Sequence, residues 1–82
     1  MAARVLLFGR LADIAGWREK RLDPGPASLA ALEAVIGAED PDLAAALRAP
    51  GVRAAVDKAI VAGDVSLAPD TEVAFMPPMS GG

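Results

Sequence analysis

The order of apolar and polar positions along the 82 residues predicts a small domain of mixed strands and helices. Residues 4–8 are almost continuously apolar, which is typical of a central strand covered on both faces. Apolar residues then recur at helical spacing over residues 11–15, and Gly16 ends the pattern, so we expect a short helix. Residues 17–22 carry alternating charges that suit an edge strand antiparallel to the first.

The strongest helical pattern follows a turn-forming cluster at residues 23–26. Ser28 is suited to the N-cap position, and the apolar stripe behind it predicts a main helix that ends at Gly37. Each stripe residue, if mostly buried, contributes about 1.5–3 kcal/mol to folding. We therefore expect this helix to lie across the sheet and anchor the fold. The stripe consists of Leu29, Leu32, Val35 and Ile36.

The second half of the chain predicts one more helix and three strands. These elements cover residues 40–47, 52–56, 59–61 and 71–76. Asp40 and Pro41 suit the cap and first turn of the helix. Asp57 and Lys58 join the two short strands, although lysine does not favour the positive φ of a tight hairpin. The order of strands and helices predicts an α+β fold with a mixed sheet.

Composition narrows the range of functions. Eighty-two residues suffice for one hydrophobic core, and a net charge of −3 without a long basic run argues against nucleic-acid binding. The chain has no cysteine and no histidine, so it offers no disulfide, thiol nucleophile, Cys/His metal site or histidine base. No segment resembles a membrane span or a signal peptide, so we expect a cytoplasmic protein that binds no membrane.

The last six residues differ from the rest of the sequence. Pro77 and Pro78 cannot donate to a sheet ladder and hold φ at about −65°, so the chain should leave the sheet as a stiff extended segment. Gly81 and Gly82 follow, and glycine permits the close approach that a narrow channel requires. Such an ending is ordinarily just a frayed terminus. Its place directly after a strand and two prolines favours a functional tail, so we divide the chain into a domain, residues 1–76, and an extended tail, residues 77–82.

Residues 73–82, VAFMPPMSGG, resemble the C-terminal signature of the small, sulfur-carrying subunit of molybdopterin synthase. Residues 5–9 and 11–16 are similar to the first strand and short helix of that family. Residues 54–57, 60–61 and 67 are similar to the middle strands of that family. The resemblance implies a ubiquitin-like β-grasp fold, with one main helix on one face of the sheet and the final strand in the centre beside the first.

Two positions depart from the family's pattern. Residues 69–71 are Pro-Asp-Thr, where the family often has glycine between two acidic residues. Aspartate tolerates the left-handed conformation, so Asp70 should preserve the turn. Met76 replaces a common aromatic residue and remains apolar. Neither change affects the Gly-Gly ending.

The resemblance also implies a chemistry for the tail. An adenylating enzyme similar to ubiquitin activators, using ATP and magnesium, would convert the carboxylate of Gly82 to an acyl adenylate, since this chain has no phosphate-binding loop of its own. A sulfur donor protein would then leave a thiocarboxylate on Gly82. In a heterotetramer with the large synthase subunit, the sulfur would pass to cyclic pyranopterin monophosphate. This chain would bind no cofactor itself and would act as a co-substrate.

Two other functions remain open. One is a sulfur carrier for another pathway, such as the thiazole of thiamin, although those relatives are typically shorter. The helical segment at residues 40–50 and the Pro77-Pro78 pair favour the molybdenum pathway. The other is a ubiquitin-like interaction module whose tail is inert.

Strand alternation suggests a face for partner binding. Val73 and Phe75 point to one side of the final strand and Met76 to the other. We assign the first two to the helix-covered core. Met76 then faces outward, with Phe8 and Ile60 as its expected neighbours in a partner-binding surface. Because the register of the strands cannot be read from sequence, each of these three residues fits a core position equally well.

Overall fold

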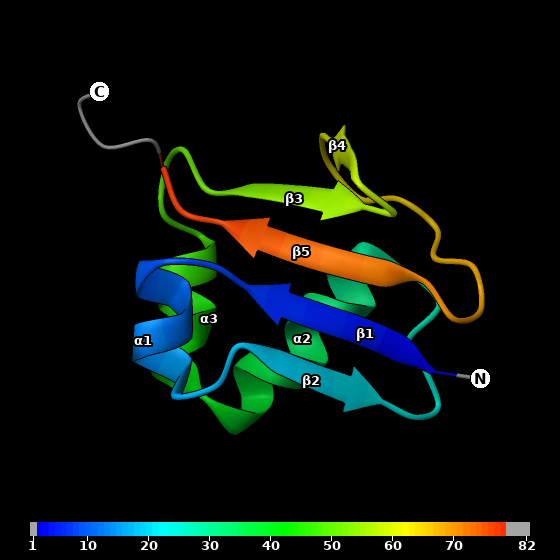
Figure 1. The fold of residues 1–82 in the computed structure, drawn as a ribbon, viewed down its shortest axis with the longest axis horizontal. Helices are drawn as coiled ribbons and strands as arrows, with labels where there is room; N and C mark the ends of the chain where they lie inside the picture. The colour runs from blue at the N-terminus through cyan, green and yellow to red at the C-terminus, as the bar shows by residue number, and fades with distance from the viewer. Residues whose placement is uncertain (1, 79–82) are drawn as a thin grey trace.

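The computed structural model describes residues 2–78, which form a five-stranded sheet and three helices (Figure 1). In chain order the elements are β1 (Ala3–Leu7), α1 (Arg10–Ala15), β2 (Glu19–Leu22), α2 (Leu29–Glu39), α3 (Pro41–Leu47), β3 (Arg53–Val56), β4 (Ala59–Val61) and β5 (Glu72–Met76).

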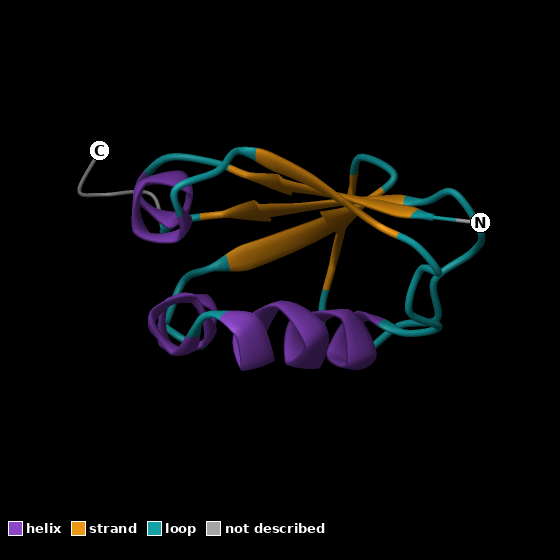
Figure 2. Ribbon diagram, turned by 90° about the horizontal axis from the view of Figure 1, so that it is seen from below, coloured by secondary structure: helices purple, strands orange, loops and turns teal. Residues whose placement is uncertain are grey.

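The strands lie in the order β2-β1-β5-β3-β4, so the first and last strands are neighbours inside the sheet. β1 and β5 are parallel, and the other pairs are antiparallel. α2 crosses one face of the sheet, and α1 lies at the end of the strands (Figure 2). The predicted α+β fold with a mixed sheet and a main helix on one face is confirmed, as is the central position of the final strand.

The core lies between the sheet and α2. Val5 and Leu7 of β1 and Val73 and Phe75 of β5 are all at most 2% exposed, which confirms the predicted inward direction of the β5 pair. The helices cover these strands with buried leucine and isoleucine side chains: Leu11, Leu29, Leu32, Ile36 and Leu43.

The predicted helix caps are confirmed. The Ser28 hydroxyl accepts a hydrogen bond from the backbone N–H of Ala31 at 3.1 Å, and Oδ1 of Asp40 accepts one from Leu43 at 3.1 Å. Each bond satisfies a backbone donor that the first helical turn leaves free. These two caps fix where α2 and α3 begin.

Two predictions about α2 are wrong. The helix continues past Gly37 to Glu39, and Gly37 instead allows close packing, because a Cβ there would lie 2.9 Å from the Cβ of Ala44 in α3. Val35, assigned to the apolar stripe, is 41% exposed. The buried face follows Leu29, Leu32 and Ile36, and Val35 lies at its edge.

The first two strands also differ from expectation. β1 is covered on one face only, because Arg4 is exposed and Leu6 half-buried between fully buried neighbours. Its apolar run extends to Phe8, but Phe8 lies beyond the strand and is 48% exposed. β2 begins at Glu19 rather than at Trp17, which packs half-buried against the core.

The predicted turns around β3, β4 and β5 are confirmed. Asp57 and Lys58 connect β3 to β4 with φ angles of 48° and 74°, so the hairpin places lysine in the left-handed region. Asp70 adopts φ 60°, as expected for the residue that replaces the family's glycine. Between β4 and β5, Ser66 forms an isolated bridge with Ser28.

Candidate functional site

The tail begins where the central strand β5 ends. β5 ends at Met76, and the N–H of Phe8 donates to the carbonyl of Phe75 at 3.1 Å, which extends the pairing of β1 and β5 to that end. Pro77 is half-buried and Pro78 is exposed. The predicted sulfur-bearing residue Gly82, and Gly81 before it, lie outside the described residues.

Both prolines contact the domain as the chain leaves β5. A Cβ added to Gly9, in the turn between β1 and α1, would lie 3.0 Å from Cγ of Pro77. A Cβ added to Gly51, in the loop before β3, would lie 2.8 Å from Cβ of Pro78. The two prolines therefore pack against bare backbone on either side of the exit from β5.

The strand register places the three predicted partner-binding residues on the face opposite α2. Met76 pairs with Arg53, Ala74 with Ala55, and Ala55 with Ile60. Leu6 pairs with Ala74 on the other side, and Phe8 continues β1 beside Met76. Residues paired in register share one face of a sheet. We call this surface the open face.

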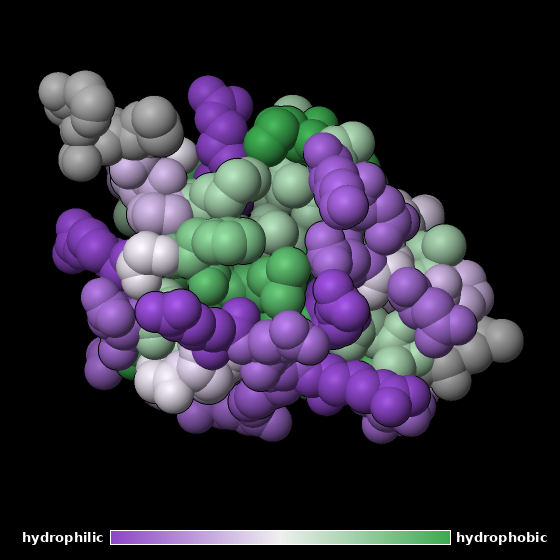
Figure 3. Space-filling view, viewed as in Figure 1, coloured by the Kyte–Doolittle hydropathy of each residue, from purple (hydrophilic) through white to green (hydrophobic). Residues whose placement is uncertain are grey.

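An apolar patch covers the half of the open face from which the tail departs. Figure 3 shows this patch in the middle of the face, bordered by polar side chains. Phe8 and Ile60 are its most exposed members, at 48% and 56%. A hollow of about 510 Å³ lies beside Phe8 towards α1 and β2, and Asp13, Arg18 and Glu19 are among the residues that line it. The apolar patch consists of Leu6, Phe8, Ala55, Ile60, Ala74 and Met76.

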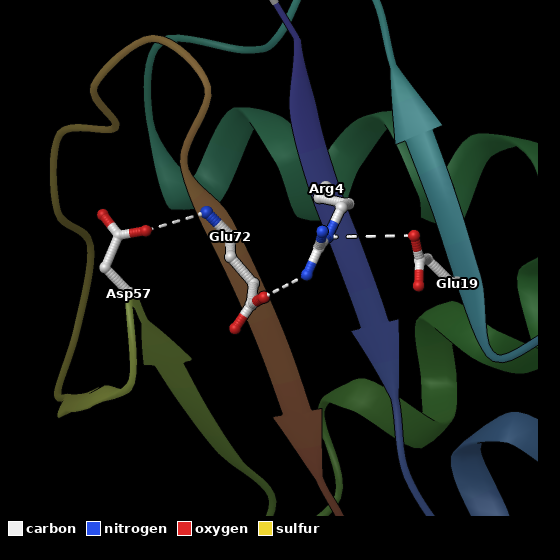
Figure 4. A network of polar contacts seen from close by, with 4 residues as sticks. All are labelled: Arg4, Glu19, Asp57 and Glu72. Atoms are coloured by element: carbon white, nitrogen blue, oxygen red, sulfur yellow. Dashed lines mark hydrogen bonds and ion pairs between the residues drawn. The ribbon is translucent and has the colours of Figure 1, made fainter.

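The other half of the open face is charged (Figure 4). Nη2 of Arg4 lies 2.6 Å from Oε1 of Glu72, and its Nε lies 3.8 Å from Oε2 of Glu19. Arg4 thus links β1 to β5 at the end of the sheet away from the tail and reaches along the face to Glu19 of β2, which is in register with Leu6. The open face is therefore charged where β5 begins and mainly apolar where β5 ends, with the exposed Arg53 beside Met76 at the border of the apolar patch.

Asp57 holds the beginning of β5 in place. Its Oδ1 accepts a hydrogen bond from the N–H of Glu72, and its Oδ2 accepts one from the hydroxyl of Thr71, both at 2.9 Å. These bonds favour the ionised carboxylate, the backbone bond most strongly, and lower the pKa of Asp57 below its ordinary value. Asp57 thus fastens the β3–β4 turn to the central strand.

A second hollow, of about 500 Å³, lies on the helix side between α2 and β3–β4. Glu33 and Asp64 both line it. Partial burial, and then the charge of Asp64, raise the pKa of Glu33, while Arg48 opposes the shift. Among the described residues, these two carboxylates do not belong to a group of three or more side chains that could hold a metal ion.

The described residues also bear on metal and membrane binding. Within residues 2–78, no three Asp, Glu, His or Cys side chains gather closely enough to hold a metal ion. In the part of the chain that the structure describes, none of the helices has the length and hydrophobicity that a bilayer crossing requires.

Sequence pattern alone did not single out Leu6, Ala55 or Ala74, because their place in the patch follows from the strand register. It also missed Gly9 and Gly51. Each of these glycines precedes or follows a predicted strand, which was the only sign available that they might lie beside another segment. Their contact with the prolines depends on the sheet order.

Two solved structures closely match the fold. The crystal structure of SAMP1 from Haloferax volcanii superposes with a TM-score of 0.85 and 25% identity, and the match covers 100% of both chains. The solution structure of the small archaeal modifier protein 1 (SAMP1) from Methanosarcina acetivorans gives a TM-score of 0.86 and 18% identity, covering 99% of this chain and 96% of that one. Both matches extend over essentially the entire sheet and all the helices. They confirm the ubiquitin-like β-grasp fold.

Sequence comparison identifies the family. No curated protein sequence matches this chain significantly. The sequence pattern of the ThiS family matches residues 5–82, which include all five strands except the first two residues of β1. Members of this family work with partner enzymes. The chain belongs to the ThiS family of ubiquitin-like sulfur carriers.

Proposed function

We propose that this chain is the sulfur-carrying subunit of molybdopterin synthase and that Gly82 bears the sulfur as a thiocarboxylate. Membership of the ThiS family supports the role of sulfur carrier. The resemblance of residues 73–82 to the synthase signature supports this particular destination. The observation that carries the proposal is that the central strand β5 brings Pro77 out of the sheet directly beside the apolar patch.

The chemistry begins with an unreactive group. An α-carboxyl titrates at about pH 3.3–3.7, so at neutral pH Gly82 presents a carboxylate that repels nucleophiles. On the adenylating enzyme, one carboxylate oxygen attacks the α-phosphorus of magnesium-bound ATP, and pyrophosphate leaves. Sulfide from the donor then attacks the acyl carbon, the bond to AMP breaks, and a thiocarboxylate remains. ATP and magnesium belong to that enzyme, and this chain contributes the acyl group.

The apolar patch is the proposed docking surface for the large synthase subunit. Phe8, Ile60 and Met76 are its proposed partner-binding residues, and the first two expose enough apolar surface to gain from burial. Ordering the tail in a partner's channel costs about 1–2 kcal/mol for each residue. The restricted φ of Pro77 and Pro78 lowers that cost, and burial of the patch offsets the remainder. A dimer of the large subunit with two carriers would form the proposed heterotetramer.

Reconstitution tests the destination of the sulfur. The carrier is first incubated with an adenylating enzyme, ATP, magnesium and sulfide, and then mixed with the large subunit and cyclic pyranopterin monophosphate. We expect molybdopterin to form in proportion to the thiocarboxylate consumed. The carrier without Gly82 is the control and should give none. A thiocarboxylated carrier that yields no molybdopterin with an active large subunit, but supports thiazole formation, would assign it to the thiamin pathway.

A second candidate function is covalent protein modification. It is favoured by the fold match to two proteins named as archaeal modifiers. An acyl adenylate also reacts with amines, so the activated Gly82 could form an isopeptide bond with a lysine of another protein as AMP leaves. Mass spectrometry of tryptic digests separates the two functions. Lysines joined to the C-terminal residues would support modification, whereas a thiocarboxylate alone supports the sulfur carrier.

A further inference from the structure

We propose that Gly9 and Gly51 are positioning residues that together set the direction in which the tail leaves the domain. The direction of the tail would matter for the proposed function, because the tail must enter a partner's active site in a fixed orientation. It rests on the contacts that each of these glycines makes with a proline.

The sheet order explains why these two turns meet the tail. β5 lies between β1, which runs parallel to it, and β3, which runs antiparallel. The end of β1 and the beginning of β3 therefore both lie beside the end of β5. Gly9 follows β1 and Gly51 precedes β3, so the chain passes between them as it leaves the sheet.

Gly9 is held firmly in place. Its φ of 56° and ψ of −131° belong to a region that only glycine enters readily. Its carbonyl accepts hydrogen bonds from the N–H groups of Ala12 at 3.1 Å and Asp13 at 3.3 Å, which begin α1. A Cβ at this position would lie only 3.0 Å from Cγ of Pro77, so the lack of a side chain at Gly9 leaves room for the proline ring.

Gly51 forms the opposite side of the exit. Its φ is 87°, and the loop around it is closed by a hydrogen bond from the N–H of Val52 to the carbonyl of Ala49 at 3.3 Å. A Cβ here would lie 2.8 Å from Cβ and 3.3 Å from Cγ of Pro78. Ordinary contacts begin at 3.4 Å, so the ring would have to retreat by about half an ångström.

A change of ring pucker moves mainly Cγ of a proline, so it cannot relieve the contact at Cβ of Pro78, which is bonded directly to Cα. The ring is also bonded to the backbone nitrogen, so displacing the ring displaces the chain itself. A side chain at Gly51 should therefore redirect everything after Pro78 while leaving the apolar patch intact. Two other glycines with positive φ show that this contact is specific, because a Cβ added to Gly16 or Gly63 meets nothing within 4 Å.

Distance measurement between spin labels in the free protein tests this inference. The sequence lacks cysteine, so Ser80→Cys and Ala31→Cys give two unique labelling sites, one in the tail and one on the exposed side of α2. The test variant is Gly51→Asn, because asparagine tolerates positive φ. The matched control is Gly63→Asn, whose φ of 72° imposes a similar backbone demand away from the tail.

We expect Gly51→Asn to shift or broaden the distance distribution and Gly63→Asn to leave it unchanged. Equal distributions in the two variants would overturn the inference. If Gly51→Asn fails to fold while Gly63→Asn folds, Pro78→Gly in the same chain should restore folding, because it removes the ring that collides. Failure of Pro78→Gly to do so would also overturn it.

Sulfur transfer provides a second readout. Gly51→Asn should lower the rate of transfer from the bound carrier by about 10- to 100-fold, as misplacement of a reacting group by about 1 Å does, with Kd for the large subunit unchanged. A fall in affinity with no change in rate would contradict a positioning role. The distance measurement needs no partner or sulfur, so it stands or falls independently of the proposed function.

Discussion

Replacing Phe8 with alanine tests the apolar patch as the docking surface. The ring lies just beyond β1, beside the base of the tail, and is 48% exposed. Its neighbours on the open face are the half-buried Leu6 and Met76. A partner that covers the patch must therefore bury the exposed part of this ring.

The size of the effect follows from that exposed area. A phenylalanine side chain buries roughly 200 Å², so about half of it corresponds to roughly 100 Å² and, at about 25 cal/mol per Å², to about 2.5 kcal/mol. The binding free energy gained at an interface is smaller than this full burial value, because the costs of ordering and desolvation offset part of it. We expect Phe8→Ala to weaken binding by about 1–2 kcal/mol, which is about 5- to 30-fold in Kd.

Titration calorimetry with the large synthase subunit measures this change. Val35→Ala is the matched control, because Val35 is 41% exposed but lies on α2, on the other side of the sheet. Thermal melting should show that both variants remain folded. If Phe8→Ala binds as tightly as Val35→Ala, the open face is not the docking surface and the partner must be recognised elsewhere.

Other substitutions test further parts of the account. Ile60→Asp and Met76→Asp should each weaken binding to the large subunit by placing a charge in the interface, and unchanged affinity in both would exclude the apolar patch. Leu32→Ala, at a fully buried position of α2, should destabilise the domain by about 2–5 kcal/mol in chemical denaturation, and a loss below that of Val35→Ala would contradict the assigned core. The lowered pKa of Asp57 means that its charge stabilises the fold above the ordinary value of 3.8 and that this contribution is lost as the pH falls through the lower folded value. The difference in melting temperature between the wild-type chain and Asp57→Asn should therefore narrow below pH 3.8, and a constant difference would refute this role.

Much of the fold could be predicted because local signals agreed with the final structure. Ser28 and Asp40 cap helices in almost any context, since their side chains satisfy N–H groups only a few residues away. Val73 and Phe75 face the core because alternation in a strand fixes which residues share a side. The central place of β5 came from family resemblance, because sequence pattern does not encode strand order.

The errors arose where contact with another element of the fold decided the outcome. Gly37 resembles a helix stop, but the approach of Ala44 in α3 gives it a packing role within α2. Phe8 extends an apolar run, yet the helix layer covers only one face of β1 and leaves its ring exposed. The contact between Gly51 and Pro78 joins residues that meet only through the sheet order. Such long-range contacts have no signature in a short stretch of sequence.

The proposed role of Gly82 is tested most directly by the intact mass of the chain after incubation with an adenylating enzyme, ATP, magnesium and sulfide. Our account predicts a mass increase equal to the exchange of one oxygen for sulfur, assigned by fragmentation to Gly82. The chain shortened by that residue should melt as the wild-type chain does and should gain no sulfur. An unchanged mass, with an activator shown to be competent on another carrier, would contradict the central claim.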